Sequence, residues 1–106
     1  MLIIETPIFT RAAQSLMPED EYRQLQSALV IRPDMGDLIP GSVGLRKLRW
    51  RLPGRGKRGG VRVVYYWATS REEIWMLLAY AKAQKEDLTP QQLKMLRRIV
   101  ETWNHG

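Results

Sequence analysis

Two stretches that alternate apolar and basic residues flank a glycine-rich loop, and they constrain the fold of this chain most. Alternation with a period of two is typical of β-strands with one buried face. We therefore expect strands at Leu45–Leu52 and Val61–Ala68, joined as a hairpin across Pro53–Gly60. One face would carry Leu48, Trp50, Val61, Val63, Tyr65 and Trp67, and the other Lys47, Arg49, Arg51, Arg62, Val64 and Tyr66.

The net charge of +6 is concentrated in the middle third of the chain. The segment Leu38–Arg71 contains no acidic residue, whereas the segments before and after it contain both signs. Its bases are Arg46, Lys47, Arg49, Arg51, Arg55, Lys57, Arg58, Arg62 and Arg71. A concentrated positive field attracts polyanions, most often phosphate backbones. The alternative is a solvated basic face without a partner.

The remaining patterns predict an α+β fold in which helices cover an antiparallel sheet. Thr6 and Thr89 are expected N-caps because each precedes a proline, and Gln92 completes a capping box with Thr89. The segment 74–81 is apolar on both faces, which indicates a strand covered on both sides. The other expected elements are an edge strand at Leu2–Glu5, helices from Pro7 to Leu16 and from Pro18 to Pro33, a loop at Gly36–Gly44 and a helix from Pro90.

Length and composition limit the class of protein. A chain of 106 residues favours one domain, residues 1–106. The absence of cysteine excludes a disulfide scaffold and a cysteine-based zinc site. We find no signal-peptide pattern and no apolar run near the roughly 18 residues of a membrane span. The expectation is a soluble, cytoplasmic, basic domain.

Three segments carry a resemblance that extends over nearly the whole chain. They are Gly44–Arg49, Gly54–Tyr65 and Ala79–Thr89. The second is the most specific, because a glycine-rich loop leads directly into Gly60-Val61-Arg62-Val63. In order, length and spacing the chain resembles the RelE/HigB-type toxins of bacterial type II toxin–antitoxin systems. The resemblance implies a microbial-RNase-like fold, with a small antiparallel sheet, two N-terminal helices and one C-terminal helix.

The resemblance also implies an activity and partners. Such toxins are endoribonucleases that cut messenger RNA in the decoding site of the ribosome and thereby stop translation. A cognate antitoxin, here expected to be a helix-turn-helix protein of the HigA kind, neutralises the toxin. Operator DNA would be bound only through the toxin–antitoxin complex. No cofactor is implied.

Cleavage of RNA without a metal requires three things of the protein. The 2′-hydroxyl must lose a proton, the leaving 5′-oxygen must gain one, and the charge of the phosphorane must be stabilised. Histidine is the usual acid or base, but the only histidine here is His105, next to the C-terminal residue, where a solvated terminal side chain is the simpler interpretation. No carboxylates have metal-ligand spacing, so a two-metal nuclease is not expected.

Cationic residues are therefore the candidates. We assign phosphate clamping and transition-state stabilisation to Arg62, as its motif position implies, and proton transfer to Lys57, Lys82 or Lys85. Lys47 and Arg49 would leave one strand face about 7 Å apart and match the strand-borne bases of the family. RNA backbone contacts are expected from Arg46, Arg51, Arg55 and Arg58, and base stacking from Tyr66. For Lys82 and Lys85, a purely solvated role is equally open.

One departure from the family concerns the general base. Some members have a catalytic tyrosine late in the chain, but this chain has none after Tyr80, whose direction the sequence leaves open. Two alternatives to the enzyme therefore remain. One is a non-catalytic module that binds nucleic acid, and the other is a cleavage-defective toxin homologue that acts as a corepressor with its antitoxin.

Overall fold

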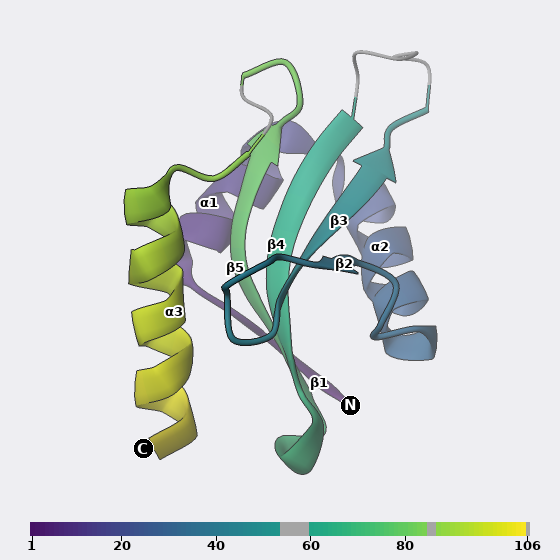
Figure 1. Ribbon diagram of the computed structural model, residues 1–106. Helices are drawn as coiled ribbons and strands as arrows, with labels where there is room; N and C mark the ends of the chain where they lie inside the picture. The colour runs from purple at the N-terminus through teal and green to yellow at the C-terminus, as the bar shows by residue number, and fades with distance from the viewer. Residues whose placement is uncertain (54–59, 85–86, 106) are drawn as a thin grey trace.

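A computed structural model of the chain describes residues 1–53, 60–84 and 87–105. Its strands form a five-stranded sheet in the order β1-β5-β4-β3-β2, with α1 and α2 on one face and α3 on the other (Figure 1). The predicted α+β class is confirmed. The elements are β1 (Leu2–Glu5), α1 (Pro7–Leu16), α2 (Glu19–Ile31), β2 (Asp37–Leu38), β3 (Leu45–Arg51), β4 (Gly60–Ala68), a one-turn helix (Thr69–Arg71), β5 (Glu73–Ala81) and α3 (Pro90–His105).

The starts of α1 and α3 are capped by the side chains that the sequence predicted. The hydroxyl of Thr6 accepts a hydrogen bond from the backbone N–H of Phe9 at 3.0 Å. At α3 the capping box is complete, because Gln92 N–H donates to the Thr89 hydroxyl at 3.1 Å and Thr89 N–H donates to the Gln92 side chain at 3.0 Å. Each bond satisfies a donor that has no partner within its helix.

The predicted hairpin forms the middle of the sheet. β3 and β4 pair antiparallel, and β4 pairs antiparallel with β5. β5 lies between β1 and β4, with Met76 in the core on the α1 and α2 side and Leu77 in the core on the α3 side. The expectation of a strand covered on both faces is confirmed.

Two features of the sheet differ from the sequence-based expectation. The segment Gly36–Gly44, predicted as loop, contains the two-residue strand β2, which pairs with Arg46 and Lys47 of β3. The sheet is also mixed, because β1 pairs parallel with β5. An alternating edge strand has the same pattern in either direction, so its direction depends on where the next element packs. Here that element is α1, which lies against β5.

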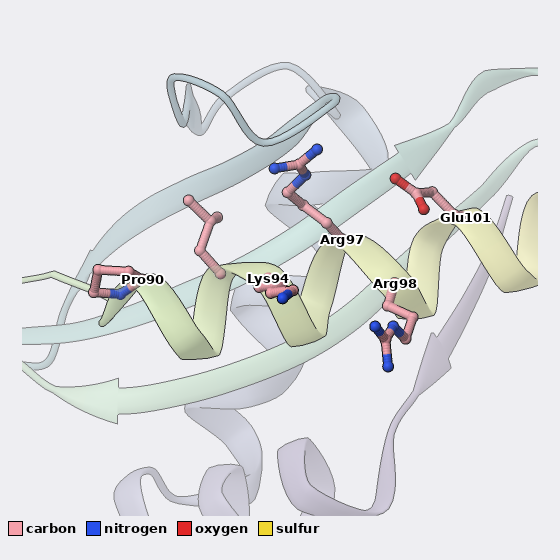
Figure 2. Close-up of a pocket in the computed structure, with 6 residues that line it drawn as sticks. Pro90, Lys94, Arg97, Arg98 and Glu101 are labelled. Carbon is pink, nitrogen blue, oxygen red and sulfur yellow. The ribbon is translucent and has the colours of Figure 1, made fainter.

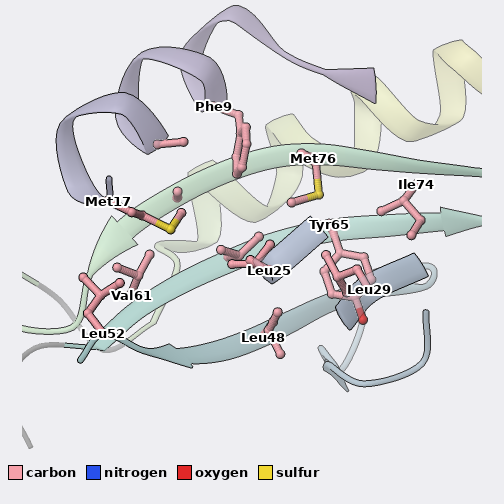
Figure 3. Packing of buried hydrophobic residues seen from close by; sticks show 13 residues of the cluster. Phe9, Met17, Leu25, Leu29, Leu48, Leu52, Val61, Tyr65, Ile74 and Met76 are labelled. Atoms are coloured by element: carbon pink, nitrogen blue, oxygen red, sulfur yellow. The ribbon is translucent and has the colours of Figure 1, made fainter. Parts of the chain in front are cut away.

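Alternation along the strands divides the buried side chains into two cores. The larger core lies between the sheet and the two N-terminal helices, as Figure 3 shows. Its members include Phe9, Leu25 and Leu29 from the helices and Val61, Val63, Tyr65 and Met76 from the strands. The smaller core joins α3, through Leu96 and Val100, to Leu45 and Val64. Among the described residues no helix combines the length and apolar content that a membrane span requires.

Tyr65 connects the sheet to the segment that follows α2. Its ring is fully buried, its hydroxyl donates to the carbonyl of Pro33 at 2.7 Å, and Gly36 N–H donates to the same hydroxyl at 2.8 Å. Burial raises the pKa of Tyr65, so the phenol stays protonated and can donate. Gly36 approaches so closely that a Cβ there would lie 2.8 Å from the Tyr65 ring.

We expect Tyr65→Phe to lower the free energy of unfolding by about 1–3 kcal/mol, because it leaves the Pro33 carbonyl and the Gly36 N–H without their partner. Denaturant unfolding followed by circular dichroism measures the change. Tyr66→Phe is the matched control, since its hydroxyl makes only an exposed contact of 3.4 Å with Asn104. Equal stability of the two variants would contradict this assignment.

Candidate functional site

Arg49 and Arg62 are direct neighbours across the β3–β4 ladder. Opposite residues on one face have Cβ atoms about 4.5–5.5 Å apart. The face is that of α3, because Val64, two residues after Arg62, packs in the α3 core. Lys47 is opposite Val64 and therefore lies on the same face. We call Lys47, Arg49 and Arg62 the sheet cluster; the structure brings these three predicted site residues together.

Arg62 is a buried cation. It is 7% exposed, and its Nε has no hydrogen-bond partner in the protein. The ion pairs among the described residues join Arg23 to Glu19 and Lys47 to Asp87, so none of them neutralises Arg62. A buried charge without a counter-charge is costly, and like charges directly opposite each other destabilise a sheet. The arrangement therefore favours an anionic ligand at this face.

The glycine before β4 proper makes room for the Arg62 guanidinium. A Cβ on Gly60 would lie 3.2 Å from Arg62 Nη1, so the side chain extends back over the start of its own strand. This is where β5 ends, because Lys82 N–H donates to the carbonyl of Gly60 at 3.0 Å. Lys82, a predicted site residue, is thus placed beside Arg62, and its side chain is half-buried.

Asp87 joins the sheet cluster although sequence reasoning did not assign it to the site. Its Oδ1 lies 2.5 Å from Lys47 Nζ, which connects the segment before α3 to β3. The hydrogen bond and the charge of Lys47 hold the pKa of Asp87 below its usual value, and Arg49 adds a smaller effect. Its place in the third family-like segment was a signal, but only the fold shows which base it meets.

Tyr80 is a second residue that the sequence did not place. It pairs with Arg62 in the β4–β5 ladder, is 4% exposed and packs in the α3 core. The three strands thus carry Arg49, Arg62 and Tyr80 in one row across the sheet. Counting along β5 could not have located Tyr80, because an irregularity between Val64 and Tyr65 shifts the register.

Two other predicted residues of β3 lie in different settings. Arg46 is on the opposite face, next to Tyr65, where its guanidinium donates to the carbonyls of Gly36 at 2.7 Å and Asp34 at 3.2 Å. The structure therefore does not bring Arg46 into the cluster. Arg51 is on the cluster face, exposed, at the end of β3 opposite Gly60.

Tyr66 shares the cluster face but lies about 13 Å along β4 from Arg62. Its ring packs against Trp75, with centroids 5.1 Å apart. Four further candidates, Arg55, Lys57, Arg58 and Lys85, lie outside the described residues, as does the side chain of His105. Among the residues that are described, no group of three or more His, Asp or Glu side chains is arranged to hold a metal ion.

We expect the carboxyl of Asp87 to titrate below the usual range and to move up towards it in Lys47→Met, since the ion pair favours the charged form. The pair is therefore present at neutral pH and is lost as the pH falls through the lowered pKa. Carbon-detected NMR titration measures the midpoint. Arg11→Met, on the other face, should leave it unchanged; an unchanged midpoint in Lys47→Met would contradict the contact.

Comparison with known proteins supports the architecture. No protein-family model matches the sequence. Among solved structures, the chain is similar to the free state of the Escherichia coli toxin RelE carrying two arginine-to-alanine substitutions. The TM-score is 0.54 at 16% sequence identity, over 80% of this chain and 86% of that one. At this identity the likeness concerns the fold, so this chain has a RelE-like α+β fold.

Proposed function

We propose that this chain is a RelE/HigB-type toxin, a metal-independent endoribonuclease that cuts messenger RNA on the ribosome and thereby inhibits translation. The observation that carries the proposal is the buried guanidinium of Arg62, directly opposite Arg49 and without a counter-charge among the described residues. The RelE-like fold and the concentration of bases in one third of the chain support it.

In the proposed reaction the 2′-oxygen forms a bond to phosphorus as the bond from phosphorus to the 5′-oxygen breaks. The products are a 2′,3′-cyclic phosphate and a 5′-hydroxyl end. Arg62 and Arg49 bind the phosphoryl oxygens and stabilise the negative charge of the phosphorane. Lys47, protonated in its ion pair with Asp87, is suited to donate to the leaving oxygen. Lys57, Lys82 and Lys85 are the candidates to accept the proton of the 2′-hydroxyl.

A second candidate function follows from the proton acceptor. Within the described residues the sheet cluster is joined by one carboxylate, that of Asp87, and this group is already paired with Lys47. A protein without a working base would bind RNA through the same cations and leave it intact. The non-catalytic RNA-binding module and the cleavage-defective corepressor are therefore outcomes of the test below.

The proposal includes partners and setting. Residues 1–106 would act as one domain in the cytoplasm, on ribosomes that are translating messenger RNA. A helix-turn-helix antitoxin of the HigA kind would cover the toxin, and the complex would bind operator DNA through the antitoxin. A small helix-turn-helix gene next to the gene for this chain would favour the toxin or the corepressor over the isolated RNA-binding module.

We expect induced expression of the wild-type chain to arrest growth and to create new 5′ ends in messenger RNA, in ribosome-containing but not ribosome-free reactions. Arg62→Ala should lower the cleavage rate at least about 100-fold, the usual effect of losing a charge-stabilising donor. Arg62→Lys should also be impaired, because lysine keeps the charge but loses the two-pronged donor.

Arg11→Ala, on α1 and exposed, is the control that removes one positive charge from the other face of the sheet. Circular dichroism and thermal melting check that each variant is folded. Full toxicity of a folded Arg62→Ala protein would reject the site. RNA binding without new 5′ ends would reject the nuclease and favour the binding module, whereas repression without growth arrest would favour the corepressor.

A further inference from the structure

The outer face of α3 carries three bases that the sequence analysis did not assign. Lys94, Arg97 and Arg98 are spaced i, i+3 and i+4 and therefore share one side of the helix. They line a shallow groove together with Pro90, Leu93 and Glu101 (Figure 2). Arg97 and Arg98 extend from opposite sides of the helix, with Lys94 between them. We call Lys94, Arg97 and Arg98 the α3 stripe.

Within the described part of the chain, no acid neutralises the stripe. Its three members are absent from the ion pairs there, and Glu101 is the one acid of the groove. The Nε of Arg97 is buried without a hydrogen-bond partner. The only other buried side-chain polar atom in this state, among the residues described, is Nε of Arg62. Native proteins satisfy nearly all such groups, and exceptions often mark sites that receive a ligand.

The stripe and the sheet cluster lie on the same side of the sheet. α3 packs on the cluster face, where Leu96 and Val100 contact the core that contains Leu45 and Val64. Asp87, three residues before α3 begins, is bonded to Lys47 of the cluster. A polyanion held at the cluster can therefore continue over α3. The bases on α1 and α2 lie on the other side and cannot extend the same surface.

We propose that the α3 stripe is a second RNA site, which binds the ribose–phosphate backbone outside the scissile phosphate and positions the RNA without cutting it. The inference rests on the proposed function and deepens it. Lysine and arginine on a solvent-facing helix suit contacts to phosphate, which add affinity independently of sequence. The simpler alternative is the solvated polar side of an amphipathic helix.

The salt dependence of RNA binding distinguishes the two. A variant with Lys94→Gln, Arg97→Gln and Arg98→Gln keeps good helix formers and removes three charges. Its ligand is a single-stranded 2′-O-methyl oligonucleotide, which lacks the attacking hydroxyl and cannot be cleaved. We expect the slope of log affinity against log salt, between about 50 and 200 mM, to become shallower by up to about 2, or roughly 0.7 for each phosphate that the variant no longer binds.

The matched control removes the same number of charges from the opposite side, with Arg11→Gln, Arg23→Gln and Arg32→Gln, all of which are at exposed or half-buried positions. Its slope should equal that of the wild type. An unchanged slope in the stripe variant, or an equal change in both variants, would overturn the proposal, because the effect would then be absent or due to net charge alone.

Cleavage on ribosomes is scored separately with the wild-type chain. If the wild type does not cleave but the slopes differ as expected, the nuclease proposal fails and the second RNA site stands. A stripe variant that misfolds would be recognised by its thermal melt. The pair Lys94→Gln and Arg98→Gln, both at exposed positions, then replaces it, with an expected slope change of about 1.4.

Discussion

The register of β4 between β3 and β5 is the constraint on which the rest of the structure depends. Val61, Val63 and Tyr65 point to the core under α1 and α2, whereas Arg62 and Val64 point to the side of α3. A slip of one residue would move every side chain of the strand to the other face. It would bury Arg62 in the larger core and remove Tyr65 from Pro33 and Gly36. Stability and the candidate site thus require the same pairing.

The same register concentrates positive charge on one face at a cost to the folded state. Arg49 and Arg62 oppose each other directly, and the one acid that meets the cluster among the described residues is Asp87. Asp87 neutralises Lys47 and leaves the two guanidinium groups without a carboxylate. A phosphate would offset the repulsion and supply acceptors for donors that the protein leaves unsatisfied. The face is therefore better suited to an anionic ligand than to water.

Residues whose settings are local could be predicted from the sequence. The threonine caps of α1 and α3 follow from side chains within three residues of the helix start, and the hairpin faces follow from alternation along each strand. Features that depend on remote partners were missed. β2 forms because β3 offers it a free edge, β1 takes its direction from the packing of α1, and Arg46 is held by carbonyls in the segment after α2.

The sequence by itself determined that this chain builds a basic hairpin within an α+β fold and that Lys47 and Arg49 share a strand face. Those properties arise from a period of two and from charges that are close along the chain. Only the tertiary structure decided that Arg62 lies opposite Arg49, that Asp87 pairs with Lys47, that Tyr80 joins the row and that the α3 stripe lies on the cluster side. Each of these depends on strand register or helix packing between segments distant in sequence, which no local pattern encodes.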